Sequence, residues 1–339
     1  MRKFIIKISF YFVPFICCVG IYLIIQSYIT GGVGELGQIP FGKEYDKRLE
    51  QNYLTENYIQ DTLINTIHHL IFNNKSTILT IGDSYSQSGE RNFRYNNYLS
   101  YLFHYSVVNI EREENTHDPV QDAISLLNSG IIDSTTCKVV IVETADRHAI
   151  WRLSAIDFEH NYSSFKKKES QKKKTTMPTL LQLCSFIRLQ FGYDNPIQKC
   201  PLIKECFNHF WGNTAFCYKN DLNLLNDTQK IEKAKQNLTL LNKRFSEKGI
   251  KLIFLICADT YDVYRPFMKD ETLPVDTTTD GLDKLPEVCV INSKYILQKM
   301  VQNGEKDVYR INDTHWSYKA SEVVAKKIAH DIDSLRILK

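Results

Sequence analysis

The sequence lacks a large excess of either charge, and this excludes several classes of protein. Its 339 residues carry 42 lysines and arginines against 39 aspartates and glutamates, a formal net charge of +3. Nucleic-acid binding needs basic residues concentrated on one face, so we expect no nucleic-acid partner. With 43% hydrophobic and 24% charged residues, the chain is not wholly disordered, collagenous or coiled-coil. Its length suits two ordinary domains or one large α/β domain with attachments.

The sequence also lacks a CxxC pair, although it has nine cysteines. Cysteine-built zinc sites use such closely spaced pairs, so a zinc site is disfavoured and we predict no metal. Four cysteines, Cys184, Cys200, Cys206 and Cys217, fall in a stretch with little apolar periodicity. In an oxidising compartment, one or two disulfide bonds among these four would hold a loop region together.

Charged residues are absent from residues 8–25, and 18 such residues reach the lower limit for spanning a bilayer. The basic flank that precedes them predicts a cytoplasmic N-terminus and a translocated body. We therefore predict an uncleaved transmembrane anchor over residues 1–30, in a single-pass inner-membrane protein whose body is periplasmic, followed by a juxtamembrane segment over 31–75. A cleaved signal peptide is the alternative, but no small-x-small site follows cleanly. A lipoprotein signal fails, because Ile16 precedes Cys17 where a small residue is needed.

The remainder, residues 76–339, alternates between two patterns. Short β-branched runs predict strands at residues 76–81, 106–110, 138–143, 250–256 and 308–311. Helical periodicity is found near residues 95–104, 120–128, 230–248, 293–302 and 317–335. This alternation implies βαβ crossovers, so the predicted fold class is α/β, a three-layer α/β/α sandwich with a parallel, doubly wound sheet.

One long interruption, at about residues 147–228, is predicted to be an insertion or lid. It contains two lysine runs, at 166–168 and 172–174. Blocks of like charge repel one another and are typical of a solvated loop. Contact with an anionic surface is the alternative interpretation.

A candidate nucleophile follows the first predicted strand. Gly82-Asp83-Ser84 places a serine just beyond the carboxyl end of a parallel strand, where open α/β sheets bind their ligands. Gly82 permits a tight exit, and backbone N–H groups at the start of the next helix can face an oxyanion. The tripeptide alone is weak evidence, because an ordinary turn with Asp83 or Ser84 as a helix cap explains it equally well.

A candidate base lies near the C-terminus. His315 can take the proton of Ser84, while Asp313 can hold the other imidazole nitrogen and fix the tautomer. The alternative is a capping cluster ahead of a helix, with an incidental histidine. Because the α/β alternation brings both motifs to one edge of the sheet, their combination favours a catalytic triad. His117 and His148 are alternative bases without a comparable companion.

The third predicted strand ends in charged residues at the same edge. Its last residues are followed by Asp146 and Arg147. Arg147 can bind an anionic or hydroxylated group of a substrate, or stabilise a developing oxyanion. The alternative is a structural ion pair between Arg147 and Glu143 or Asp146.

These motifs together resemble the SGNH (GDSL-like) hydrolase superfamily, and within it the alginate O-acetyltransferase group, AlgJ/AlgX-like. The segments that carry the resemblance are 79–86 (LTIGDSYS), 92–93, 107–109, 139–147 (VVIVETADR) and 313–317 (DTHWS). The resemblance covers roughly residues 76–150 and 305–330. Such proteins move acyl groups onto or off extracytoplasmic glycans.

The resemblance implies roles for individual residues. Ser84 is the expected nucleophile, His315 the general base and then acid, and Asp313 its orienting partner. The candidate oxyanion or substrate-binding groups are the Ser84 backbone N–H, Asp83, Asp146, Arg147 and Trp316.

The predicted function is a membrane-anchored O-acetyltransferase that passes acetyl from an acyl-serine intermediate to an exported or cell-surface polysaccharide, with no cofactor. The resemblance also implies a polytopic membrane-bound O-acyltransferase as the source of acetyl. Two alternatives stay open. One is an SGNH carbohydrate esterase with the same triad, and the other is a catalytically inactive glycan-binding or assembly protein.

Overall fold

The computed structural model describes residues 2–29, 36, 78–87, 93–110, 118–135, 137–161, 196–209, 211–222 and 227–334. Several predictions fall outside the described residues. They concern most of the juxtamembrane segment, the two lysine runs, His117 and Cys184.

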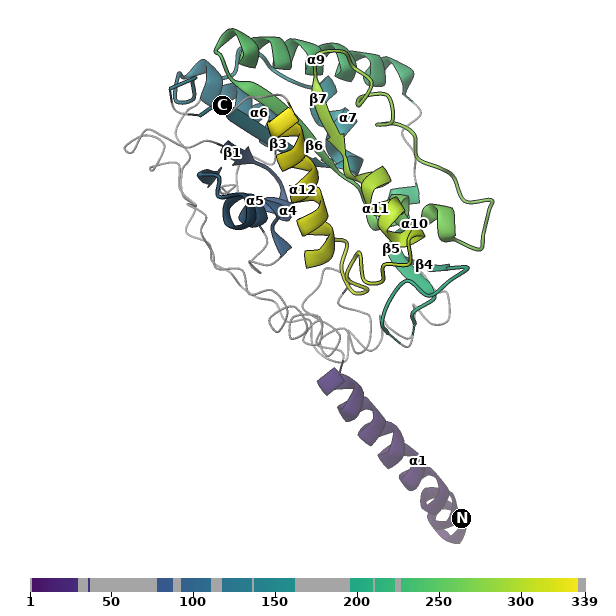
Figure 1. Cartoon of the computed structure of the whole chain (residues 1–339). Helices are drawn as coiled ribbons and strands as arrows, with labels where there is room; N and C mark the ends of the chain where they lie inside the picture. Colours follow the sequence, from purple (N-terminus) through teal and green to yellow (C-terminus); the bar gives the residue numbers. More distant parts are fainter. Residues whose placement is uncertain are drawn as a thin grey trace.

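Five parallel strands form the central sheet, in the order β2-β1-β3-β6-β7 (Figure 1). The strands are β1 (Ile78–Ile81), β2 (Val107–Ile110), β3 (Val139–Ala145), β6 (Lys251–Cys257) and β7 (Cys289–Asn292). From β1 the chain first adds a strand on one side and then continues on the other, which is a doubly wound order. The predicted α/β class with a parallel sheet is confirmed.

Helices cover both faces of this sheet. Residues Ile78, Val139 and Ile141 point into one apolar cluster, together with α5 (Tyr95–Phe103), α11 (Ser293–Gln302) and α12 (Tyr318–Ser334). The alternate residues Leu79 and Val140 point into a second cluster, with α6 (Pro119–Asn128), α7 (Asp146–Ser154) and α9 (Thr228–Glu247). Figure 1 shows α12 and α5 side by side in front of the sheet. Each fully buried Val, Ile or Leu contributes about 1.5–3 kcal/mol, so these two layers fix the sheet.

The predicted strand at residues 308–311 is wrong. Tyr309 forms only an isolated bridge with Trp316, and the fifth strand is β7 instead. Val308, Tyr309 and Ile311 are apolar because their side chains are buried in the core, within a loop that folds back on itself. The backbone N–H of Ser317 donates to the carbonyl of Val308 at 2.9 Å and closes this loop.

The range predicted as an insertion contains regular structure. Helix α7 packs against α9 and β6, so it is part of one helical layer. Strands β4 (Ile197–Pro201) and β5 (Thr214–Tyr218) form a separate antiparallel hairpin, followed by the short helix η2 (Lys219–Leu222). The short helices α10 (Thr260–Tyr264) and η3 (Arg265–Phe267) follow β6, and α10 packs against β5.

Helix α1 (Arg2–Ile29) covers the segment predicted as an anchor. Among the residues that the structure describes, no helix is both long enough and apolar enough to cross a membrane. The anchor therefore stays a prediction from the sequence.

Candidate active site

A tight turn after β1 presents Ser84. Residues Gly82 and Asp83 leave the strand, and Ser84 begins the short helix α4 (Ser84–Gln87) with its side chain exposed. A Cβ atom at Gly82 would collide with the carboxylate of Glu143, so only glycine fits beside β3. The sequence thus places a serine at the carboxyl edge of the sheet and leaves its hydroxyl accessible.

The structure brings Ser84, His315 and Asp313 together. Ser84 Oγ and His315 Nε2 form a hydrogen bond, and His315 Nδ1 lies 2.7 Å from Asp313 Oδ1. The same carboxylate oxygen accepts the backbone N–H of His315 at 3.1 Å. Because an ionised carboxylate only accepts, Nδ1 carries the proton and Nε2 is free to accept from Ser84. This arrangement can activate a serine for attack on an acyl carbon.

Arg310 holds Asp313 from the side opposite His315. Its guanidinium forms a buried ion pair with Asp313 Oδ2 and also lies 4.8 Å from the ring centre of Phe93. Burial raises the pKa of Asp313, but the hydrogen bond from His315 and the charge of Arg310 outweigh burial and bring this pKa below its ordinary value. Asp313 is therefore a carboxylate that can stabilise an imidazolium. Sequence reasoning missed Arg310, whose only signal is its position three residues before Asp313.

Aromatic packing orients the loop that carries His315. The ring of Tyr85 lies 4.9 Å from that of His315 and 4.5 Å from that of Trp316, and its hydroxyl donates to the carbonyl of Thr314 at 3.2 Å. Trp316 is completely buried. In this structure the indole packs against Tyr85 and thereby supports the loop of His315, and a contact of Trp316 with oxyanion or substrate stays a prediction.

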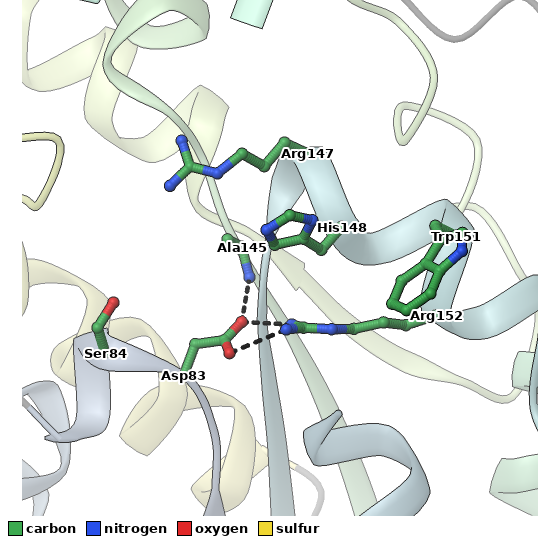
Figure 2. Close-up of a pocket in the computed structure, with 7 residues that line it drawn as sticks. All are labelled: Asp83, Ser84, Ala145, Arg147, His148, Trp151 and Arg152. Atoms are coloured by element: carbon green, nitrogen blue, oxygen red, sulfur yellow. Dashed lines mark hydrogen bonds and ion pairs between the residues drawn. The ribbon is translucent and has the colours of Figure 1, made fainter. Parts of the chain in front are cut away.

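Asp83 ties the nucleophile turn to β3 and α7. Its carboxylate forms a buried ion pair with Arg152 and accepts the backbone N–H of Ala145 at 3.1 Å (Figure 2). Arg152 also donates to Thr144 Oγ1 at 2.6 Å. The carboxylate of Asp83 thus holds the nucleophile turn against β3 and α7. Asp83 also lines the pocket, so its contact with oxyanion or substrate stays a prediction. Sequence reasoning missed Arg152, since α7 was not predicted.

Glu143 lies directly beneath the turn. It is fully buried, and its Oε1 accepts the backbone N–H of Asp83 at 3.1 Å. Burial, reinforced by the charge of Asp83, raises the pKa of Glu143 to about 8. The sequence had suggested Glu143 only as an ion-pair partner of Arg147, whereas here it supports the residue before the nucleophile.

A pocket of about 310 Å³ opens beside Ser84. Seven residues line it, namely Asp83, Ser84, Ala145, Arg147, His148, Trp151 and Arg152 (Figure 2). Arg147 lies at the pocket, as predicted, with Nη1 3.0 Å from Asp259 Oδ1 and 3.4 Å from Asp221 Oδ1. The ion pairs that the structure gives for Arg147 are thus with Asp259 and Asp221, where the sequence had suggested Glu143 or Asp146. His148 also lines the pocket, but the imidazole that contacts Ser84 is that of His315.

Two buried aspartates lie next to the pocket. Burial raises the pKa of Asp259 to about 8, although Arg147 opposes this, and burial together with the charge of Asp276 raises that of Asp146 to about 7. Asp146 is buried and is not among the residues that line the pocket, and its contact with oxyanion or substrate stays a prediction. Within the described part of the chain, no three His, Cys, Asp or Glu side chains are arranged to hold a metal ion.

A serine, a histidine and an aspartate at the carboxyl edge of a parallel sheet are the arrangement expected of an SGNH hydrolase-like domain. A family model with the description "SGNH hydrolase-like domain, acetyltransferase AlgX" matches residues 216–338. The predicted resemblance to the SGNH superfamily and its AlgX-like group is confirmed. The matched range contains His315 and Asp313, and Ser84 lies outside it. The match supports an esterase or acetyltransferase activity in general. No curated protein matches this chain.

Proposed function

We propose that this protein is an O-acetyltransferase that acetylates a polysaccharide through an acyl-Ser84 intermediate. The observation that carries the proposal is the continuous series of contacts from Ser84 through His315 and Asp313 to Arg310. The family model that matches residues 216–338 describes an acetyltransferase domain, and this supports acyl transfer as the reaction.

In the first half-reaction, Ser84 Oγ attacks the acetyl carbonyl carbon while its proton passes to His315 Nε2. The carbonyl electron pair moves onto oxygen, where the Ser84 backbone N–H is one available donor. Collapse of this intermediate breaks the bond to the donor's alkoxide, which takes the proton back from Nε2. Asp313 stabilises the imidazolium throughout, because it is a carboxylate already bonded to Nδ1.

In the second half-reaction, a sugar hydroxyl replaces the donor. His315 Nε2 removes its proton as the oxygen attacks the acetyl carbon, and then returns a proton to Ser84 Oγ as the ester bond to serine breaks. Water in place of the sugar would make the protein an esterase, so the two functions differ in acceptor binding and water exclusion.

The proposal places this reaction outside the cytoplasm, with residues 1–30 as an anchor. The uncharged run at residues 8–25 and its basic flank support that topology. A membrane-bound O-acyltransferase is the proposed acetyl source, since acetyl must cross the membrane before it reaches Ser84.

The test is the intact mass of the protein after incubation with p-nitrophenyl acetate. We expect one added acetyl group, mapped to Ser84 and absent from Ser84→Ala and His315→Ala. Ser334→Ala, an exposed serine on α12, is the matched control and should acylate normally. Added glycan should accelerate loss of the acetyl group and become acetylated. Loss to water alone, at a rate independent of glycan, would favour the esterase, and no acylation would remove both functions.

A further inference from the structure

Helix α7 presents two different faces. Ala149, Ile150 and Leu153 are buried among the apolar layers, whereas Arg147 and Trp151 are exposed. Residues four apart lie on the same side of a helix, so Arg147 and Trp151 share the side that lines the pocket of Ser84. Figure 2 shows these side chains, with His148, projecting from one helix around the pocket.

Trp151 is the unusual member of this face. Its side chain is 57% exposed, although it lies in a helix whose neighbouring residues are buried. Among the large apolar side chains that the structure describes as exposed, Trp151 alone lines this pocket. The exposed indole leaves a wide apolar surface in water at the pocket, and ligand pockets are lined mainly by apolar and aromatic side chains.

A buried ion pair fixes Trp151 relative to the nucleophile. Asp83 immediately precedes Ser84, and Arg152 immediately follows Trp151. Asp83 and Arg152 are both buried and form an ion pair with each other. This ion pair therefore fixes the backbone at Ser84 relative to the backbone at Trp151. A ligand that touches both groups meets a preorganised site, which reduces the ordering cost of binding.

The charges around the pocket are already paired. Arg152 is matched by Asp83, and Arg147 by Asp221 and Asp259. The pocket therefore offers little uncompensated charge to attract an anion. It offers an apolar ring face together with polar groups of Arg147 and His148, and this suits a pyranose, whose C–H face is apolar and whose rim carries hydroxyls.

We infer that Trp151 is the sugar platform of this site: one pyranose ring of the acceptor stacks on its indole while a hydroxyl of the bound saccharide reaches the acetyl group on Ser84. The inference rests on the proposed function and deepens it by naming the acceptor contact. It makes Trp151 a substrate-binding residue that acts on the second half-reaction and not on acylation.

The test separates binding from chemistry by using full-length protein that carries Ser84→Ala. Binding of cellotetraose, xylotetraose, mannotetraose and chitotetraose is measured by calorimetry. We expect at least one of them to bind, and Trp151→Ala to weaken that binding about tenfold, as loss of a stacked aromatic predicts. Tyr101→Ala, which removes a 37% exposed aromatic from α5, is the matched control and should leave affinity unchanged.

In protein that retains Ser84, Trp151→Ala should raise the KM for the saccharide in acetyl transfer by a larger factor than it slows acylation by p-nitrophenyl acetate. Unchanged affinity in Trp151→Ala, or no binding of any of the four sugars, would overturn the inference. Slower acylation of Trp151→Ala with unchanged sugar binding would show that Trp151 contacts the acetyl donor instead. That result would also overturn the inference. Failure of Ser84 to acylate would remove the proposed function, whereas Trp151-dependent binding would still be observed.

Discussion

Arg310 and Asp313 form a buried ion pair on the side of the carboxylate that faces away from His315. Asp313 Oδ1 is hydrogen-bonded to the imidazole of His315, and Asp313 Oδ2 is paired with the guanidinium of Arg310. A carboxylate desolvated by burial would otherwise tend to protonate, so the hydrogen bond from His315 and the charge of Arg310 together keep Asp313 ionised where an imidazolium develops.

Asp313→Asn should abolish most acyl transfer without unfolding the protein. An amide cannot hold the Nδ1 proton as a carboxylate does, so we expect acylation to fall about 10³–10⁴-fold. Asp313→Glu is a useful control, because it retains the charge at a changed distance and should lose less. Acylation is measured by intact mass over time, and activity within about tenfold of wild type in Asp313→Asn would remove Asp313 from the mechanism.

The lowered pKa of Asp313 also predicts a pH dependence of stability. Its ordinary value is 3.8, and the folded value lies below this. The stabilisation is therefore fully present above pH 3.8 and is lost as pH falls through the folded pKa. The measurement is urea unfolding of the wild type and of Asp313→Asn at several pH values. The difference between their unfolding free energies should become smaller as the pH falls below 3.8. A difference that does not vary with pH would contradict the ionised state.

The Asp83–Arg152 pair should be a major structural contact. Both residues are buried, so Arg152→Met leaves an uncompensated carboxylate and should cost about 3–5 kcal/mol of unfolding free energy. On α12 the exposed Lys326 pairs with the half-buried Glu322, and Lys326→Met should cost less than about 1 kcal/mol of unfolding free energy. Denaturant unfolding measures both variants. Similar costs for the two would show that the buried pair does not anchor the nucleophile turn.

Much of this fold could be predicted because buried apolar runs are easy to recognise. Residues of β3 are buried along the whole strand, and the sequence VVIV shows it. Strand β7 was missed because Cys289 and Val290 are only partly buried and the strand is short. Residues 308–311 have the same apolar character as a strand but serve a packed loop, which local pattern cannot distinguish.

The candidate site was predictable to the extent that it depends on topology. Ser84 follows a strand of a parallel sheet, and the pairing with Asp313 and His315 needed only the two motifs at one edge. Arg152 and Glu143 were not recognisable, because their importance comes from burial against the nucleophile turn, which no spacing in the sequence reveals.

Glu143 should destabilise the folded protein as pH rises. Its pKa is about 8 when folded, against an ordinary 4.5, so it is protonated in the folded state over a range where the unfolded chain is ionised. The unfolding free energy of the wild type, measured relative to that of Glu143→Gln, should be highest below pH 4.5. It should then fall as the pH rises, until about pH 8. We expect Glu143→Gln to be more stable than wild type by over about 2 kcal/mol above that pH.

The measurement for Glu143 is urea unfolding across this pH range. Glu232→Gln, an exposed glutamate on α9, is the matched control and should follow the wild-type pH profile. A constant difference between Glu143→Gln and wild type from pH 4.5 to 8 would mean that Glu143 is ionised in the folded protein.

The sequence allowed several disulfide pairings among four cysteines, and the hairpin of β4 and β5 favours one of them. Cys200 and Cys217 are buried on neighbouring strands with their sulfur atoms 3.5 Å apart. Cys206 instead donates to the carbonyl of Lys204 at 3.8 Å. The hydrogen bond from Cys217 lowers the pKa of Cys200, which makes Cys200 the better attacking thiolate.

In an oxidising compartment, we expect a disulfide of another protein to oxidise Cys200 and Cys217 to a disulfide bond. Cys200 attacks the disulfide of the other protein to form a mixed disulfide, Cys217 displaces the oxidant's thiolate, and the two cysteines together lose two electrons and two protons. The cysteines are 17 residues apart. Closing a loop of that length stabilises the chain by about 3 kcal/mol, and reductant should remove that stabilisation. Alkylation in denaturant without reduction, followed by mass analysis, should leave Cys200 and Cys217 unmodified in protein exported to the periplasm, because unfolding exposes these buried cysteines to the reagent if they are free thiols. Cys206→Ser should not change this result, whereas alkylation of Cys200 in the exported protein would contradict the bond.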